Sequence, residues 1–191
     1  MGGGAPRLVA PAARFRASFL RALAEYHAEG PLNRELDESL LEDPAEFARY
    51  VGALRADVGA PGASFRYIFR LSREQPHDPQ ADGWVPQTVL WWATGDEYLG
   101  RLSIRHRLSA DLPRRRGHIG YDVRPGVRRR GHATAMLAAA LPLAAALGID
   151  PAHVHCDCDY DNVASRRVIE KNRGRLDREE GGWLYYLLPT R

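Results

Sequence analysis

A short basic segment in the second half of the chain has the residue types that a phosphate-binding turn needs. It consists of Arg128, Arg129, Arg130, Gly131, His132, Ala133 and Thr134. Small residues at positions 131 and 133 let a ligand approach the backbone closely. A helix is predicted at 131–147, and the unpaired N–H groups and dipole of a helix N-terminus favour a phosphate. The segment therefore predicts a pyrophosphate site, although a solvated basic turn before an ordinary helix has the same spacing.

This segment differs from the two commonest phosphate-binding loops. The chain contains neither G-x-x-x-x-G-K-[ST] nor G-x-G-x-x-G. Neither a P-loop nor a Rossmann fold is therefore predicted.

Two motifs, in this order, resemble those of the GCN5-related N-acetyltransferases (GNATs). Arg128-x-x-Gly131-x-Ala133 is similar to the family signature R/Q-x-x-G-x-G/A, and it lies between a predicted strand and a predicted helix, as in that family. Residues 162–174, NVASRRVIEKNRG, resemble the second family motif, N-x-x-[AS]-x-x-x-[YI]-x-x-x-x-G. The resemblance is specific over 117–174, extends to the strands from residue 64 onward, and is weak before them.

The resemblance implies a binding site for acetyl-CoA, used as co-substrate. The backbone of Val123, Arg124 and Pro125 would bind the acetyl carbonyl and the pantetheine arm where adjacent strands splay apart. Arg128, Arg129 and the amides of Arg130, Gly131, His132, Ala133 and Thr134 would bind the pyrophosphate. Asn162 would contact pantetheine, and Ser165 and Arg166 would lie along the coenzyme. The expected reaction is direct attack by a primary amine on the thioester in a ternary complex, without a covalent enzyme intermediate.

The groups that move protons are left open by the sequence. Many relatives use a tyrosine of the second motif as the acid, but Ile169 occupies that position here. Cys158 and Tyr160 are candidate acids, and water is a third, because a thiol with a pKa of about 8.5 is a tolerable leaving group. His118 is the preferred base, since a histidine titrates near pH 6.5. Asp122, on the same strand face, and Glu97, at a predicted hairpin, are its rivals.

Hydrophobic periodicity predicts the elements that position these residues. Helices are expected at 12–29, 44–58, 131–147 and 162–172, and strands at 64–71, 88–94, 97–106, 118–124, 153–158, 176–179 and 183–188. This mixture predicts a mixed α/β or α+β fold. The resemblance implies a central, mostly antiparallel twisted sheet with splayed strands, flanked by helices. Residues 1–11 are expected to form a flexible tail and 12–191 a single domain, whose helices over 12–59 shape the acceptor site.

Composition limits the alternatives without selecting one. The 191 residues carry a net charge of +3, which suits a polyanionic small ligand as well as nucleic acid. A nucleic-acid-binding module is one alternative, because of the arginine runs at 114–116 and 128–130, but no helix-turn-helix or RRM signature accompanies them. A non-catalytic acyl-CoA sensor or scaffold is another. No secretory signal or stretch of about 20 apolar residues is present, so a cytoplasmic protein is expected.

Three further features have an ordinary structural explanation. Strand alternation places His153 and His155 on one face and Cys156 and Cys158 on the other, so no metal site is predicted. Trp84, Trp91, Trp92 and Trp183 are expected in the core, with an acceptor pocket as the alternative. Relatives often dimerise through late strands such as 183–188, so a homodimer is one expected state.

Overall fold

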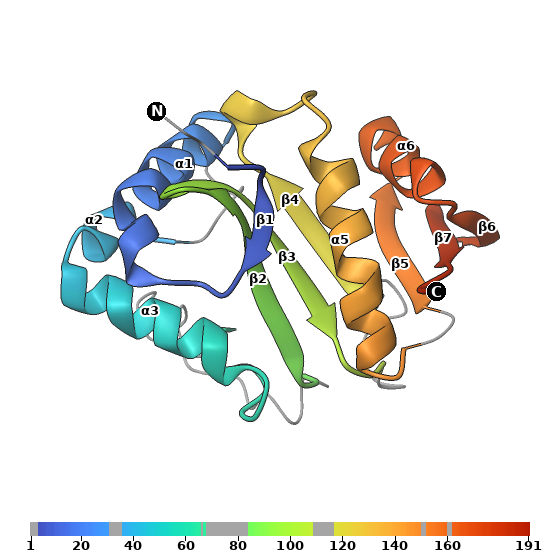
Figure 1. Cartoon of the computed structure of the whole chain (residues 1–191), viewed down its shortest axis with the longest axis horizontal. Coiled ribbons are helices and arrows are strands. Elements are labelled where there is room, and N and C mark those ends of the chain that lie inside the picture. The colour runs from blue at the N-terminus through green and yellow to red at the C-terminus, as the bar shows by residue number, and fades with distance from the viewer. Residues whose placement is uncertain are drawn as a thin grey trace.

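The computed structural model describes residues 4–30, 36–65, 67, 84–108, 117–149, 152–159 and 162–191, with only the backbone described over 152–159. Its elements, shown in Figure 1, are β1 (Arg7–Val9), η1 (Ala13–Phe15), α1 (Arg16–Ala28), α2 (Glu38–Leu41), α3 (Pro44–Ala56), β2 (Gln87–Thr94), β3 (Glu97–Arg105), β4 (Ile119–Val123), η2 (Pro125–Val127), α5 (His132–Ala146), β5 (Ala152–Asp159), α6 (Val163–Lys171), β6 (Arg175–Glu180) and β7 (Trp183–Leu188).

The strands form two antiparallel sheets whose neighbouring edges are β4 and β5. One sheet has the order β1-β2-β3-β4, and the other has the order β5-β7-β6. Strands β4 and β5 approach each other, but no ladder joins them. Among the described residues, one edge of β4, next to the second sheet, thus has no strand partner.

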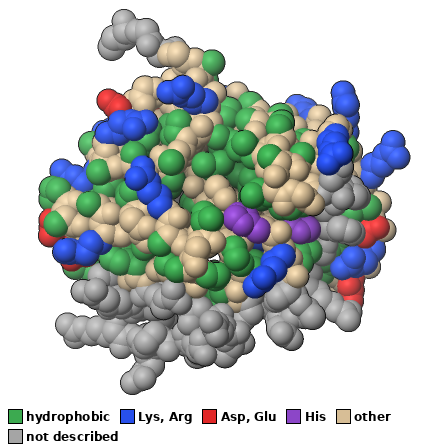
Figure 2. Space-filling model, turned by 60° about the horizontal axis from the view of Figure 1, so that its bottom comes forward, with side chains coloured by type: hydrophobic (Ala, Val, Ile, Leu, Met, Phe, Trp, Pro, Cys, Tyr) green, Lys and Arg blue, Asp and Glu red, His purple; other side chains and the backbone are tan. Residues whose placement is uncertain are grey.

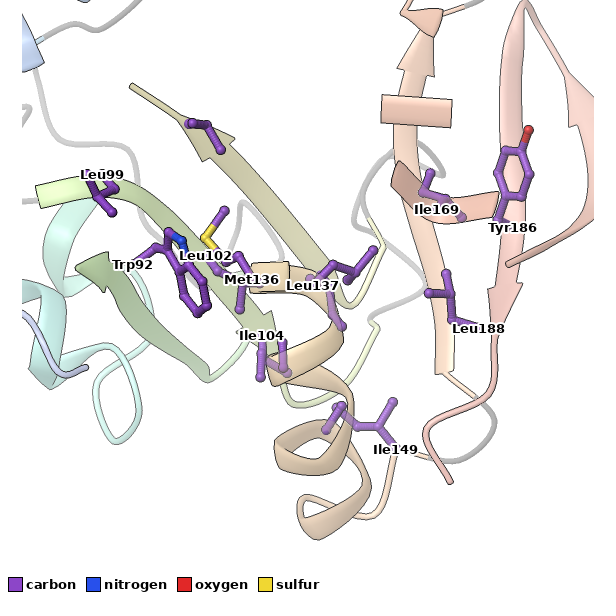
Figure 3. Packing of buried hydrophobic residues seen from close by; sticks show 14 of the residues in the cluster. Trp92, Leu99, Leu102, Ile104, Met136, Leu137, Ile149, Ile169, Tyr186 and Leu188 are labelled. Atoms are coloured by element: carbon purple, nitrogen blue, oxygen red, sulfur yellow. The ribbon is translucent and has the colours of Figure 1, made fainter. Parts of the chain in front are cut away.

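Helices cover both faces of the first sheet, and each face has its own core. On one face, the aromatic side chains of Phe19, Phe47 and Trp91 pack between α1, α3 and the sheet. On the other face, α5 places Met136 and Leu137 in a second cluster with residues of both sheets. Figure 3 shows these two side chains between those of the first sheet and those of α6 and β7. Burial of α5 against both sheets holds β4 and β5 at their separation.

Local sequence explains where the helices that flank the site begin. The Asp43 carboxylate accepts a hydrogen bond from the Ala45 N–H at 2.8 Å, and Pro44 follows at the first helical position of α3. Asn162 caps α6 in the same manner, accepting from the Ser165 N–H at 3.0 Å. Helix α6 ends at Lys171, and Gly174 follows in the turn, where a Cβ would collide with Ile169.

The structure corrects two predictions about local structure. Arg7–Val9, expected in a tail, forms β1 and pairs antiparallel with β2, because Leu8 and Val9 pack against the two cores. Residues 63–65 and 67 are helical, not the start of a strand. Asp57 holds this turn by accepting hydrogen bonds from the Ser64 N–H at 2.9 Å and the Ser64 hydroxyl at 2.5 Å.

Most other predicted elements are confirmed within one or two residues. The hairpin turns at Gly95, whose φ is 54°, as the Gly-Asp pair predicts. Trp91 and Trp92 are buried, one in each core, so the core interpretation of these two tryptophans is confirmed and the acceptor-pocket alternative is wrong for them.

Candidate functional site

Strand β4 directs half of its backbone groups away from its own sheet. The Arg124 N–H donates to the Leu99 carbonyl at 2.9 Å, and the His118 carbonyl accepts from the Arg105 N–H at 2.6 Å. Since backbone groups alternate between the two edges of an antiparallel strand, the groups of Tyr121 and Val123 face the edge toward β5. Within the described residues, β4 forms a ladder with β3 alone. A linear ligand with amide groups can therefore pair with this edge, where the Val123 carbonyl already accepts a hydrogen bond from Arg128 Nε at 3.0 Å.

The edge of β4 leads into a turn that exposes the N-terminus of α5. Arg129 has a φ of 61° and Gly131 has a φ of 82°, so the chain reverses sharply before the helix. Gly131 is the N-cap residue, and no side chain of the described residues caps α5. A Cβ at Gly131 would meet nothing within 4 Å, so space is open here. The first N–H groups of α5 are thus oriented for an anion.

The arginines of this region have different surroundings. The Arg124 guanidinium donates to Glu25 Oε1 through Nε at 2.9 Å and Nη2 at 2.7 Å. Arg128 donates to both oxygens of Glu29, at 2.6 and 3.0 Å, and to the Val123 carbonyl at 3.0 Å. Arg129 and Arg130 are exposed. The predicted contact of Arg128 with pyrophosphate therefore stays a prediction, because Arg128 is exposed like Arg129 and Arg130 but is paired with Glu29.

Glu25, on α1, fixes the start of the turn from the opposite side. Its Oε2 accepts from the Gly126 N–H at 2.8 Å. A Cβ at Gly126 would lie 3.0 Å from both carboxylate oxygens, so the missing side chain lets Glu25 approach the backbone. The hydrogen bond from Arg124, together with that from Gly126, lowers the pKa of Glu25 despite its partial burial. Glu25 is therefore ionised at neutral pH and holds η2 against α1.

The three predicted base candidates lie in different environments. Glu97 accepts from the Ser18 hydroxyl at 2.8 Å and from Arg21 at 2.6 Å. Burial opposes ionisation of Glu97, but these two hydrogen bonds outweigh it and lower its pKa, which makes Glu97 a weak base. Asp122 Oδ1 accepts from the Tyr26 hydroxyl of α1 at 2.6 Å. His118, half-buried, immediately precedes β4 and lies four residues before Asp122, about 13 Å away along the chain, so it and Asp122 reach different positions.

The acid candidates named from sequence are only partly placed. The backbone of Cys158 pairs with Leu184, whereas its side chain and the whole of Tyr160 lie outside the described residues. Ile169 is fully buried in the core cluster. A phenol that sequence reasoning missed belongs to Tyr121, whose hydroxyl donates to the Ser165 carbonyl of α6 at 3.3 Å. Tyr121 alternates with Ile119 and Val123 along β4, a pattern that is typical of core residues and gives no sign of a catalytic role.

Residues of the two motifs start the helices that flank the β4 edge. Asn162, Ser165 and Arg166 form the first turn of α6, and the Arg166 guanidinium donates to Glu170 at 2.9 Å. At the start of α5, His132 Nδ1 accepts from the Trp92 indole N–H at 3.2 Å. Burial and the charge of Arg130 lower the pKa of His132, so a neutral ring accepts this bond. The Asn172 amide links the two helices by donating to the Thr134 carbonyl at 3.2 Å.

Two other predicted properties can be compared with the described part of the chain. Among the described residues, no three His, Cys, Asp or Glu side chains cluster as a metal site, and the side chains of 153–158 lie outside the description. No described helix combines the length and the apolarity that a membrane span requires. On the face drawn in Figure 2, lysine and arginine side chains are scattered among hydrophobic and other atoms rather than forming one stripe.

The family of the chain follows from a comparison with protein-family models. The model described as an acetyltransferase (GNAT) domain matches residues 19–175, which include the β4 edge, the turn and α6. The chain belongs to the GNAT acetyltransferases. The fold class that the two motifs implied is therefore confirmed, as is the recognition of the family from those motifs.

Solved GNAT structures share the fold at low sequence identity. A microcin C7 self-immunity acetyltransferase, MccE, in complex with acetyl-CoA and AMP has a TM-score of 0.50 at 10% identity, over 96% of this chain and 89% of that one. Mycobacterium smegmatis RimJ, in complex with CoA-disulfide, has a TM-score of 0.51 at 20% identity, over 98% and 85%. No curated protein matches the chain. At such low identities the likeness shows a common fold alone. It does not identify the acceptor of the acetyl group.

Proposed function

We propose that this GNAT domain transfers an acetyl group from acetyl-CoA to a primary amine by direct attack within a ternary complex. The observation that supports this most is the continuity of the β4 edge, which has no strand partner among the described residues, with the N-terminus of α5, which no described side chain caps. The edge suits the amide groups of pantetheine, and the helix start suits a pyrophosphate. The two solved structures cited above hold acetyl-CoA or CoA-disulfide on the same fold.

Each part of the coenzyme has a proposed location. The acetyl carbonyl and pantetheine lie along Val123, Arg124 and Pro125, at the β4 edge. The pyrophosphate lies at Gly131 and the first amides of α5, with Arg129 and Arg130 supplying positive charge. On the other side, Asn162, Ser165 and Arg166 of α6 line the pantetheine arm. Tyr26 and Asp122 lie on the α1 side of β4, so the amine enters from the side of the N-terminal helices.

Proton transfer at the amine is assigned to His118 through bridging water molecules, because His118 lies five residues before Val123, roughly 16 Å along the strand. An amine needs a free lone pair to attack the thioester carbonyl, so a base must remove a proton from an ammonium substrate. Glu97 is unsuited because Ser18 and Arg21 stabilise its ionised form. Asp122 is already an acceptor for Tyr26 and is better suited to orienting an ammonium group. When the C–N bond forms and the C–S bond breaks, the sulfur takes the electron pair of the C–S bond.

The test begins with binding and continues with turnover. A thermal-shift panel of acyl-CoAs should raise the Tm most with acetyl-CoA, because a ligand that binds the folded state stabilises it. Thiol release from acetyl-CoA is then measured with amino acids, polyamines, aminoglycosides and peptides as acceptors. No stabilisation by any acyl-CoA would overturn the proposal.

A non-catalytic acyl-CoA sensor is the second candidate. It is favoured by Ile169, a fully buried side chain without a proton to donate at the position of the usual acid. Acetyl-CoA binding combined with no thiol release from the whole amine panel would support the sensor over the enzyme.

A further inference from the structure

The first turn of α6 receives a phenol from β4, one helical turn from Ile169. The Tyr121 hydroxyl donates to the carbonyl of Ser165. Ser165 and Ile169 are four residues apart on α6, so they lie on the same helix face, about 6 Å apart. The phenol therefore links β4 of the first sheet to α6. It lies one helical turn from Ile169, whose side chain is aliphatic.

The environment of Tyr121 fixes its ring while leaving its hydroxyl bond weak. The ring is half-buried and packs against the core cluster that contains Ile169. The hydroxyl bond to Ser165 is long, at 3.3 Å, compared with about 2.8 Å for a typical O–H···O bond. Its acceptor is a carbonyl inside α6, which an i+4 N–H of the helix also engages. This one hydrogen bond is thus easily exchanged for one to a stronger acceptor.

We propose that Tyr121 is the catalytic acid that protonates the departing thiolate of coenzyme A. This inference rests on the proposed function, because it requires the thioester to lie at the β4 edge. As the amine nitrogen forms its bond to the acetyl carbon, the C–S bond breaks and its electron pair moves to sulfur. The sulfur takes the Tyr121 hydroxyl proton, and the resulting phenolate takes a proton from water. A phenol titrates near pH 10, so it carries its proton at neutral pH.

Tyr186 is a second phenol near α6 among the described residues, and it provides the comparison. It lies on β7, is buried, and interacts with Arg166 of α6. Figure 3 shows it with Ile169 and Leu188 on the side of the second sheet. Its removal takes away a phenol that interacts with the same helix and leaves the β4 residues unchanged.

The experiment measures thiol release from acetyl-CoA with the best amine of the panel, from about pH 6.5 to about pH 10.5. We expect Tyr121→Phe to lower kcat about 10- to 100-fold, below the usual contribution of a general acid because water can replace it. The KM for acetyl-CoA should stay within about twofold, and the fall of kcat at alkaline pH should disappear. Tyr186→Phe should retain both the rate and the alkaline fall. A purely structural role of Tyr121 would alter KM or Tm and leave the alkaline fall in place.

Opposite results would overturn the assignment. These are an unchanged kcat in Tyr121→Phe, an alkaline fall that persists in it, or a loss of rate in Tyr186→Phe instead. If Tyr121→Phe does not fold, 3-fluorotyrosine at position 121 keeps the shape and lowers the pKa of the phenol, so an alkaline fall that does not move would overturn the assignment. A wild-type protein that releases no thiol with any amine would overturn the proposed function and the role of Tyr121 together. An active wild type with an unaffected Tyr121→Phe would overturn Tyr121 alone.

Discussion

The four arginines around the turn form two pairs with opposite surroundings. Arg124 and Arg128 face α1, where Glu25 and Glu29 pair with them. Arg129 and Arg130 are exposed beside the start of α5. The number of arginines around the turn therefore overstates the positive charge available to a phosphate, because carboxylates already oppose two of the four.

The acidic partners of the first pair give this difference a structural meaning. Glu25 and Glu29 belong to the N-terminal helices expected to shape the acceptor site, about 100 residues before the turn in the sequence. Through Glu25, α1 holds both a guanidinium and the backbone N–H of Gly126. We infer that one pair of arginines positions the turn, whereas the other pair binds the coenzyme.

The largest effect is expected from reversing the charge of the exposed pair. Arg129→Glu combined with Arg130→Glu should weaken acetyl-CoA binding about 100-fold, or about 2.7 kcal/mol, because two charge-assisted contacts with pyrophosphate are lost. Titration calorimetry measures the Kd. The double control Arg7→Glu and Arg175→Glu makes the same change in net charge at exposed strand positions and should change the Kd less than about twofold. Equal losses in the two double variants would contradict a local site.

Removing the charge of Glu25 should mainly reduce stability. Glu25→Gln leaves Arg124, whose side chain is only 14% exposed, without its nearest carboxylate, at a cost of about 1.5 kcal/mol at neutral pH. The pKa of Glu25 is lowered on folding, so its contribution is present above the unfolded pKa and is lost as the pH falls through the folded pKa. The Tm difference between the wild type and Glu25→Gln should thus shrink below about pH 4.3.

The control for this comparison is the exposed pair of Arg178 and Glu180 on β6. Glu180→Gln should change stability by less than about 0.5 kcal/mol, as expected for a surface ion pair. A Tm difference for Glu25→Gln that is independent of pH would show that its carboxylate charge does not hold the turn.

Alanine substitutions at the two ends of α5 distinguish the effect of backbone strain from the effect of ligand contact. Gly131 and Gly148 both have left-handed φ values, 82° and 77°, and a Cβ at either meets nothing within 4 Å. Alanine should therefore reduce stability similarly at both ends, by about 1 kcal/mol. Only Gly131→Ala should also weaken acetyl-CoA binding, about fivefold, or about 1 kcal/mol, because its methyl group occupies the space proposed for pyrophosphate. A similar loss of affinity in Gly148→Ala would mean that the strain, not the site, is responsible.

Local patterns predicted most of the fold. The Gly95-Asp96 turn, the Asp43-Pro44 helix start and the period-2 alternation of β4 depend on neighbours in sequence, and the structure confirms each. The strand expected at 64–71 does not begin as predicted, because Asp57 pairs with Ser64 and stabilises a helical turn. The three-residue strand β1 was missed, since Arg7–Val9 is ordered by pairing with β2, some 80 residues later.

The candidate site was predicted only in part, because local patterns place its helices whereas contacts between distant segments set the surroundings of its side chains. The two motifs correctly place the starts of α5 and α6, because caps and small residues are local signals. The surroundings of the side chains come from distant segments, as with Tyr121 and Ser165, or Tyr26 and Asp122. Arg128 is the clearest case, because its motif position suggested a phosphate ligand while Glu29, 99 residues away, accepts its hydrogen bonds.

Arg128 also allows a test, with the smallest expected effect, of the inference that one pair of arginines positions the turn and the other binds the coenzyme. Glu29→Gln removes the carboxylate that opposes Arg128, in a pair whose side chains are both more than a third exposed, so little stability should be lost. The released guanidinium lies in the turn that leads to α5, and its positive field should tighten acetyl-CoA binding about threefold, or about 0.6 kcal/mol. The gain should disappear in Glu29→Gln combined with Arg128→Gln, and it should shrink as salt rises. A weaker Kd in Glu29→Gln, with its Tm unchanged, would instead assign the Glu29–Arg128 pair to positioning the turn, as with Glu25.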